Sequence, residues 1–148
     1  MNNIFLAEME PNADSISAIF GENLKTICIV EDEVLIAQDL EFLLEENGHD
    51  VCSIACDCKS ALKAAEDFKP DYFLMDINVL GDIDGIEIAC LIQEIHKTHI
   101  IFHSSDAISQ HIERLKKIKC LDYIEKPMSN RILLELLDKN LSVICQNL

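Results

Sequence analysis

The sequence predicts an α/β fold in which a parallel sheet is covered by helices on both of its faces. Two observations lead to this prediction. From residue 25 onward, short apolar runs of strand-forming residues alternate five times with segments whose apolar residues recur at helical spacing. The connections between these segments are short, which is typical of consecutive βα units rather than of separate helical and strand domains.

Five apolar runs are predicted to be strands. Because crossovers between parallel strands are right-handed, few strand orders remain, and the flavodoxin-like order 2-1-3-4-5 is the common one. We therefore expect a flavodoxin-like (βα)5 doubly wound parallel sheet with this order. The predicted strands are TICIV (26–30), DVCSI (50–54), DYFLM (71–75), HIIFH (99–103) and LDYIE (121–125).

Five segments that follow these strands are predicted to be helices, over residues 33–47, 59–68, 85–96, 106–118 and 129 to about 145. Gly48 is placed to end the first helix, Pro70 stops the second, and Ser129 is a suitable N-cap for the last. The residues expected to face the core are Ile36, Leu40, Leu43 and Leu44 in the first helix, Leu62, Ala65 and Phe68 in the second, Ile88, Ile92 and Ile95 in the third, and Ile108, Ile112 and Leu115 in the fourth.

Length and composition exclude several classes of protein. The 148 residues suit one domain, and a hydrophobic fraction of 49% excludes a disordered chain despite a net charge of -15. The acidic balance argues against direct nucleic-acid binding, and no apolar run approaches the roughly 18 residues of a membrane span. The first 24 residues hold four acids and no Lys or Arg, unlike a signal peptide. Together with seven cysteines, an odd number, this predicts reduced thiols in the cytoplasm.

Residues 1–24 precede the alternating pattern, so the α/β domain is placed at residues 25–148. Polar residues suited to an N-cap come before one apolar helical face, which is made of Ile16, Ile19, Phe20 and Leu24. We expect this extension to form a short amphipathic helix that docks on the domain or on a partner. A frayed tail is the alternative.

The functional crevice of such a sheet lies beyond the carboxyl ends of its strands. Glu31 and Asp32 follow the first strand there, Asp76 follows the third, Ser104 the fourth and Lys126 the fifth. Three crowded carboxylates repel one another, and a hard divalent cation with oxygen ligands, such as Mg²⁺, would hold them ionised. The strand ends therefore predict an Mg²⁺ site with a hydroxyl and an ammonium beside it.

This group of side chains has the parts that phosphoryl transfer needs. A phosphoryl group brought to Asp76 would have Mg²⁺, the Lys126 ammonium and the Ser104 hydroxyl around its oxygens, where they neutralise and position it. A carboxylate of this kind is an established nucleophile. We therefore expect Asp76 to accept a phosphoryl group.

From residue 25 onward the chain resembles the receiver domain of bacterial two-component response regulators. The matching stretches are CIVEDE (28–33), YFLMD (72–76), DG (84–85), IIFHSS (100–105) and DYIEKP (122–127). The resemblance implies that a sensor histidine kinase or a histidine phosphotransfer protein donates a phosphoryl group to Asp76. It also implies a phosphoacceptor that takes part in its own phosphorylation and dephosphorylation, rather than a conventional enzyme.

The resemblance further implies a ligand set for Mg²⁺. Asp32 and Asp76 would ligate it directly, Glu31 would support it through water, and Asn78 would offer its backbone carbonyl. One departure affects this site, because the stretch DINVLGDIDG (76–85) is one residue longer than the usual spacing and lacks its proline. The exact metal geometry is therefore left open by the sequence.

For the switch, the resemblance implies that Ser104 is the hydroxyl that responds to phosphorylation and that Tyr123 is the aromatic coupled to it. An ordinary strand aromatic is the alternative for Tyr123. Lys126 would bind the phosphoryl oxygens. Asn78 and Asp106 stand two residues past the acceptor and the switch hydroxyl, where polar side chains order an attacking water in the chemotaxis regulators that this chain resembles. A short-lived phosphoryl state is therefore expected.

No effector domain follows the last helix, so a stand-alone receiver is expected, which acts on a downstream protein effector or passes its phosphoryl group on. The fourth helix, fifth strand and fifth helix form a face that commonly changes on phosphorylation in this family. A symmetric homodimer through this face is one hypothesis, and an ordinary solvated face is the other. The charged residues concerned are Arg114, Lys116, Lys117, Glu125, Glu135 and Asp138.

The same residues bear on four other functions. The stretch 76–87 places acids and a glycine as an EF-hand calcium loop does, but Leu80 stands where an oxygen ligand is needed and a strand precedes the loop. A dehalogenase-type phosphatase needs a second Asp where Asn78 stands. A flavodoxin needs a phosphate-binding loop where Glu31 and Asp32 would repel it. A degenerate receiver that acts as a static binding module remains an alternative.

Overall fold

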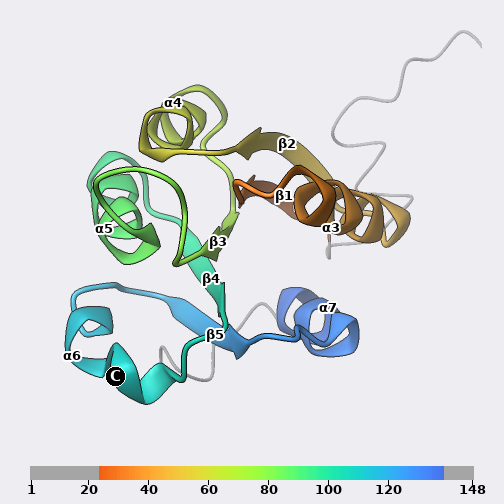
Figure 1. The fold of residues 1–148 in the computed structure, drawn as a ribbon. Helices are drawn as coiled ribbons and strands as arrows, with labels where there is room; N and C mark the ends of the chain where they lie inside the picture. The colour runs from red at the N-terminus through yellow and green to blue at the C-terminus, as the bar shows by residue number, and fades with distance from the viewer. Residues whose placement is uncertain (1–23, 139–148) are drawn as a thin grey trace, which may run out of the picture.

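The computed structural model describes residues 24–138, and within them five parallel strands form one sheet in the order β2-β1-β3-β4-β5. This confirms the flavodoxin-like order expected from the sequence. The strands alternate along the chain with helices, so strands that follow one another in the sequence are joined by helical crossovers (Figure 1). The strands are β1 (Thr26–Val30), β2 (Asp50–Ala55), β3 (Tyr72–Asp76), β4 (His99–Ser104) and β5 (Leu121–Glu125).

Helices cover both faces of the sheet, as Figure 1 shows. Helices α3 and α7 lie on one face, and α4, α5 and α6 lie on the other, each set above its own hydrophobic cluster. The elements of the described residues are α3 (Val34–Glu46), α4 (Cys58–Phe68), α5 (Gly85–Ile95), the 3-10 turn η2 (Ile108–Gln110), α6 (Ile112–Leu115) and α7 (Asn130–Asp138). Among residues 24–138, no helix is long and apolar enough to cross a membrane.

The strands are buried on both faces, so successive residues point into different halves of the core. Cys28, Val30 and Met75 belong to the cluster under α4 and α5, whereas Ile29 and Leu74 belong to the cluster under α3 and α7. Successive side chains of a strand point to opposite faces, so a residue at a strand end points to the same face as the residue two positions before it. Glu31, Asp76 and His103 therefore belong to the face covered by α3 and α7, as Ile29, Leu74 and Ile101 do. Ser104 belongs to the opposite face, as Phe102 does.

The helix boundaries agree with their sequence signals. Gly48 follows the end of α3 with a φ of 85°, a backbone conformation that favours glycine. Ser129 precedes α7, and its Oγ accepts a hydrogen bond from the Ile132 amide at 3.4 Å. Asp57 and Ser60 form a capping box at the start of α4. These local contacts help to set the end of α3 and the starts of α4 and α7.

The prediction of one continuous helix over residues 106–118 is wrong. The chain forms the 3-10 turn η2 and then the single turn α6, and Ile112 is 39% exposed instead of facing the core. The cause is local, because the Asp106 amide donates to Ser104 Oγ and the Asp106 carboxylate contacts His111 Nε2 at 2.9 Å. These bonds hold the polar part of the segment as turns, so α-helical geometry begins only after His111.

Two further residues expected in the core are exposed. Phe68 is 52% exposed and Ile95 is 40% exposed, and each is the last residue of its helix. A helical stripe read from the sequence does not show where the sheet beneath it ends. The expected extension helix, apart from Leu24, and the end of the last helix beyond residue 138 lie outside the described residues.

Candidate functional site

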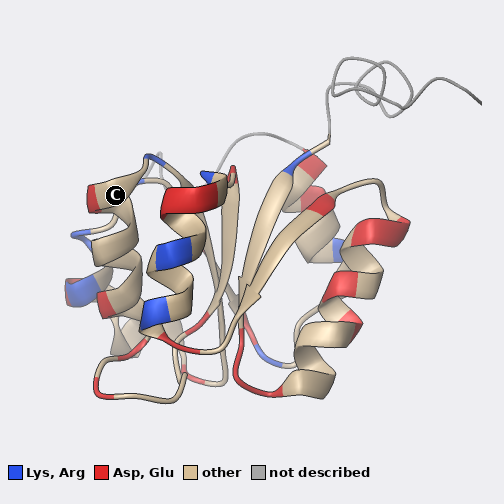
Figure 2. Cartoon of the chain, turned by 90° about the horizontal axis from the view of Figure 1, so that it is seen from above, with Lys and Arg blue, Asp and Glu red and all other residues tan. Residues whose placement is uncertain are grey.

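Three carboxylates meet at the carboxyl edge of the sheet. Glu31 directly follows β1, Asp32 comes next, and Asp76 is the last residue of β3, so the adjacency of β1 and β3 brings them together. One oxygen from each of the three lies within 4.8 Å of the other two. Glu31 and Asp76 are buried, and Asp32 is half-buried. Figure 2 shows the acidic loop from β1 into α3, a helix whose own charged residues are all acidic.

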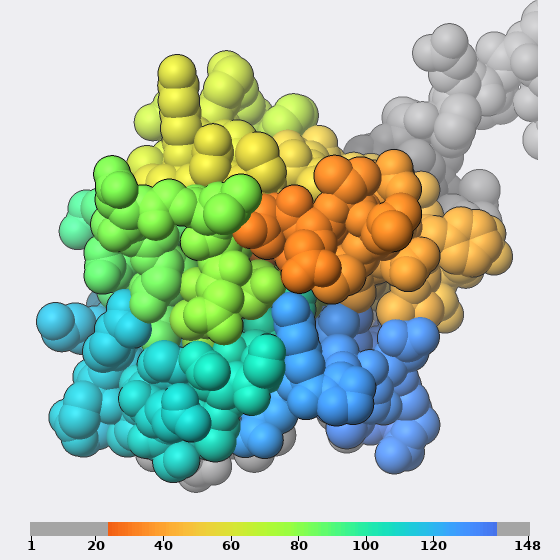
Figure 3. All heavy atoms as spheres, viewed as in Figure 1, coloured from red at the N-terminus to blue at the C-terminus, as the bar shows by residue number. Residues whose placement is uncertain are grey.

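Lys126 reaches this acidic cluster from the end of β5. Its Nζ lies 3.1 Å from Asp76 Oδ2 and 3.9 Å from Glu31 Oε2. The Lys126 amide also donates to the Ser104 carbonyl at 2.7 Å, which ties the end of β5 to the end of β4. In Figure 3, which faces this edge, the segments that follow β1, β3, β4 and β5 meet near the centre of the molecule. The structure therefore brings together every strand end that the sequence singled out.

Glu31 is a buried carboxyl whose environment disfavours its charge. Burial raises the pKa of its carboxyl to about 7, and the charge of Asp76 adds to the rise. The Glu33 amide donates to Glu31 Oε1 at 3.1 Å, but Oε2 has no hydrogen-bond partner among residues 24–138. A buried carboxylate oxygen without a donor, beside two further carboxylates, is the oxygen-rich donor set that a hard divalent cation takes. The residues present fit such a cation.

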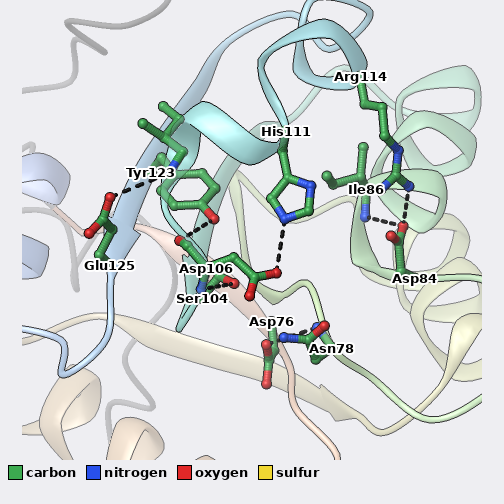
Figure 4. Close-up of polar contacts among 11 residues, drawn as sticks. Asp76, Asn78, Asp84, Ile86, Ser104, Asp106, His111, Arg114, Tyr123 and Glu125 are labelled. Atoms are coloured by element: carbon green, nitrogen blue, oxygen red, sulfur yellow. Dashed lines mark hydrogen bonds and ion pairs between the residues drawn. The ribbon is translucent and has the colours of Figure 1, made fainter.

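The loop after Asp76 is fixed by short backbone contacts. The Asn78 amide donates to Asp76 Oδ1 at 3.1 Å, while the Asn78 side chain is exposed (Figure 4). Gly85 packs on the backbone of the strand end, and a Cβ built there would lie 2.2 Å from the Asp76 carbonyl oxygen. The Gly85 amide donates to the Ile77 carbonyl at 2.8 Å. The Asp-Gly pair therefore has a steric reason, because only glycine allows α5 to start this close to Asp76.

The same loop shows that the calcium interpretation is wrong. Asp76 ends strand β3, whereas an EF-hand loop begins at the end of a helix. Asp84, which would sit at the ninth loop position, instead caps α5 by accepting hydrogen bonds from the Ile86 and Glu87 amides.

Ser104 and Tyr123 each form a hydrogen bond with the backbone of Asp106, and this residue links them. The Asp106 amide donates to Ser104 Oγ at 3.1 Å, and the Tyr123 hydroxyl donates to the Asp106 carbonyl at 2.8 Å (Figure 4). Burial raises the pKa of Tyr123, so the phenol stays protonated and able to donate. The predicted switch pair thus shares one contact residue, which the sequence had placed only in the role of ordering water.

The segment around α6 is tied to the site at two further points that sequence reasoning missed. Arg114 Nη2 lies 2.7 Å from Asp84 Oδ1, in the loop that follows Asp76, and His111 contacts Asp106. Figure 4 shows both pairs bridging from α6 and the turn before it to the loops below. Sequence separations of 30 and 5 residues give no periodic signal for such pairs.

His103 is the other missed residue. It is 1% exposed, and its Nε2 lies 3.9 Å from Glu31 Oε2. Burial lowers the pKa of the imidazole to about 4, so it is uncharged at neutral pH. A signal was available in the sequence, because a histidine that ends the apolar strand run HIIFH is polar where the preceding residues are apolar.

The sequence matches the response regulator receiver family and several curated response regulators. The family model of the response regulator receiver domain matches residues 27–138. The transcriptional regulatory protein PdtaR of Mycobacterium tuberculosis is 30% identical over 119 residues, which are 80% of this chain and 56% of the relative. The alkaline phosphatase synthesis transcriptional regulatory protein PhoP of Bacillus subtilis is 34% identical over 112 residues, 72% of this chain and 44% of the relative. The chain thus spans about half the length of these relatives.

Solved structures agree with this match. The signal receiver domain of a modulated diguanylate cyclase from Desulfovibrio desulfuricans is 31% identical with a TM-score of 0.70, over 79% of this chain and 95% of that one. The receiver domain of a Francisella response regulator is 30% identical with a TM-score of 0.66, over 78% of this chain and 98% of that one. With the strand order and the strand-end residues described above, these matches place the chain in the response regulator receiver family of two-component signal transduction.

Proposed function

We propose that Asp76 is the phosphoacceptor of this receiver and that its donor is the phosphohistidine of a sensor kinase or of a phosphotransfer protein. The contact of Lys126 Nζ with Asp76 Oδ2 at 3.1 Å, beside two more carboxylates, carries the proposal. It supplies a nucleophile, a fixed cation and a cation-binding donor set at one point.

In the proposed reaction a carboxylate oxygen of Asp76 attacks phosphorus, the P–N bond of the donor breaks, and its electron pair stays on the imidazole nitrogen that leaves. Mg²⁺ held by Asp32, Asp76 and the Asn78 carbonyl, with Glu31 supporting it through water, would neutralise charge on the carboxylates and on the phosphoryl oxygens. Lys126 Nζ, which contacts Asp76 Oδ2 before the reaction, would contact one oxygen of the transferred phosphoryl group afterwards. The Lys126 backbone amide donates a hydrogen bond to the Ser104 carbonyl at 2.7 Å, which holds this end of β5 beside the end of β4.

The Ser104 hydroxyl is proposed to turn toward the phosphoryl group once Asp76 carries it. It now accepts from the Asp106 amide, and that bond would be lost. Tyr123 and His111 both contact Asp106, so the change would reach β5 and the segment before α6. This supports the proposed switch roles of Ser104 and Tyr123 and an output by protein–protein contact.

The test is intact-mass measurement after incubation with acetyl phosphate and Mg²⁺. We expect one phosphoryl group on the native chain and none on Asp76→Asn, because the amide is not a nucleophile. Asp82→Asn is the matched control, since Asp82 is an exposed acid of the same loop and should still allow phosphorylation. An equal mass gain on Asp76→Asn would place the acceptor elsewhere. Absence of both a phosphoryl adduct and beryllofluoride binding would favour the static binding module instead.

The proposed homodimer through α6, β5 and α7 faces a specific obstacle. Lys116 is paired with Glu113 at 2.9 Å, and Arg131 with Glu135 at 3.3 Å, within one chain. A dimer would therefore exchange charge pairs rather than add new ones, and exposed pairs contribute little. We propose a downstream protein effector, in the cytoplasm, as the first choice of partner. Light scattering with and without beryllofluoride tests the dimer, and an unchanged mass would reject it.

A further inference from the structure

Three buried polar atoms beside the acidic cluster lack a hydrogen-bond partner among residues 24–138. They are Glu31 Oε2 and both ring nitrogens of His103. Buried polar groups are nearly always paired, because leaving one unpaired in the interior costs the full loss of its hydration. Two of these three atoms face each other, since His103 Nε2 lies 3.9 Å from Glu31 Oε2.

The placement of His103 makes this pairing specific. His103 is paired with Asp76 across β3 and β4, and it continues the same face parity as Glu31 and Asp76. Its ring is therefore directed to the buried base of the site rather than to solvent. An apolar side chain would suit the neighbouring core better, so the polar ring needs a partner, and Glu31 Oε2 is the acceptor that the structure offers.

We propose that His103 is a positioning residue of the cation site, which donates from Nε2–H to Glu31 Oε2 and so fixes the orientation of that carboxylate. A hydrogen bond of about 2.9 Å requires the two groups to approach by roughly 1 Å, a side-chain adjustment. One such bond satisfies two of the three unpaired atoms at once. The inference rests on the proposed function, because it assigns Glu31 to divalent-cation binding.

The physical effect of the bond is on cation affinity. A carboxylate that already points at the site loses less freedom when the cation binds, and groups that hold metal ligands in this way change affinity about 10- to 100-fold when removed. Direct ligation by His103 is the competing arrangement. It would favour transition metals over Mg²⁺, because imidazole is a nitrogen ligand.

Two variants separate the donor from the volume of the ring. His103→Leu keeps an apolar side chain and removes the donor, whereas His103→Gln places an amide donor near the former Nε2. Mn²⁺ serves as the probe cation, with binding followed by loss of the free-ion EPR signal and with Mg²⁺ as competitor. We expect His103→Leu to weaken both cations about 10- to 100-fold and His103→Gln to restore most of the affinity. Thermal denaturation in EDTA establishes that each variant is folded.

A second measurement does not depend on any variant. Nitrogen-15 correlation spectra of the cation-free native chain report the tautomer of each imidazole, and His103 is expected to carry its proton on Nε2. Unchanged Mn²⁺ affinity in His103→Leu, or a proton on Nδ1, would overturn the proposal. So would nitrogen hyperfine coupling from His103 to bound Mn²⁺, since that shows direct ligation.

These outcomes are distinct from failure of the proposed function. A native chain that takes a phosphoryl group on Asp76 while His103→Leu binds cations normally would leave the phosphoacceptor in place and remove only the role of His103. A native chain that neither binds Mn²⁺ nor accepts a phosphoryl group would remove the proposed function itself.

Discussion

Gly85→Ala tests the steric argument for the Asp-Gly pair. The added Cβ would lie 2.2 Å from the Asp76 carbonyl oxygen and 2.8 Å from Ile77 Cα, and real Cβ atoms essentially never come closer than 3.0 Å. The start of α5 or the end of β3 must therefore move by at least 0.8 Å, the difference between 3.0 and 2.2 Å. Both neighbours are backbone atoms, so no side-chain rotation relieves the contact.

Overpacking of this kind costs about 1–3 kcal/mol of the free energy of unfolding. At about 4 °C per kcal/mol for a domain of this size, Tm should fall by about 4–12 °C. Because the displaced atoms belong to Asp76 and Ile77, the rate of phosphorylation by acetyl phosphate should fall as well. Thermal denaturation and a time course of intact mass measure the two effects on the same sample.

Gly81→Ala is the control for this experiment. Gly81 has a φ of 128°, but a Cβ there meets nothing within 4 Å. It should destabilise through backbone strain of about 1 kcal/mol and leave phosphorylation of Asp76 unchanged. If Gly85→Ala keeps the native Tm and phosphorylation rate, the close approach of α5 to Asp76 is not what requires the glycine.

Three further predictions concern charge and the switch. The pKa of Glu31 is raised to about 7 in the folded chain, so its contribution to stability is fully present below its unfolded value near 4.5 and is lost as pH rises through 7. In EDTA, the Tm of the native chain should decrease from pH 5 to pH 8, and the decrease should be smaller in Glu31→Gln. Equal slopes of Tm against pH in the two proteins would refute the raised pKa of Glu31. Arg114→Met breaks the half-exposed pair with Asp84 and should cost only about 1 kcal/mol, yet speed hydrogen exchange across residues 106–118; unaltered exchange would speak against a tie to α6. Tyr123→Phe removes the bond to Asp106 and should lower stability by about 1 kcal/mol without slowing phosphorylation, and a slower mass gain would count against a purely coupling role.

The sheet and the main residues of the site were predictable because both follow from short-range rules. Apolar runs identify the strands, and parallel order brings their carboxyl ends to one edge, so Asp76 and Lys126 were expected together before any distance was known. Their contact is 3.1 Å. The same rule placed Glu31 and Asp32 beside Asp76.

The features that were not predicted depend on contacts that leave no periodic pattern in the sequence. The break before α6 arises from side chains that bond the backbone and each other near Ser104, and these compete with helix formation. The exposure of Phe68 and Ile95 depends on where the sheet ends beneath each helix. The approach of His103 to Glu31 depends on the register of β4 against β3 and on the position of β1, which three separated segments set together.

Asp106 uses its amide, its carbonyl and its carboxylate for three different partners, at 3.1, 2.8 and 2.9 Å. A single residue therefore holds a hydroxyl, an imidazole and a phenol through its two backbone groups and its side chain. Such a junction has few intermediate arrangements, since moving the residue enough to lose one partner disturbs the other two. We therefore expect this corner of the molecule to change between two discrete arrangements, with exchange between two sets of NMR signals rather than a gradual drift of one set.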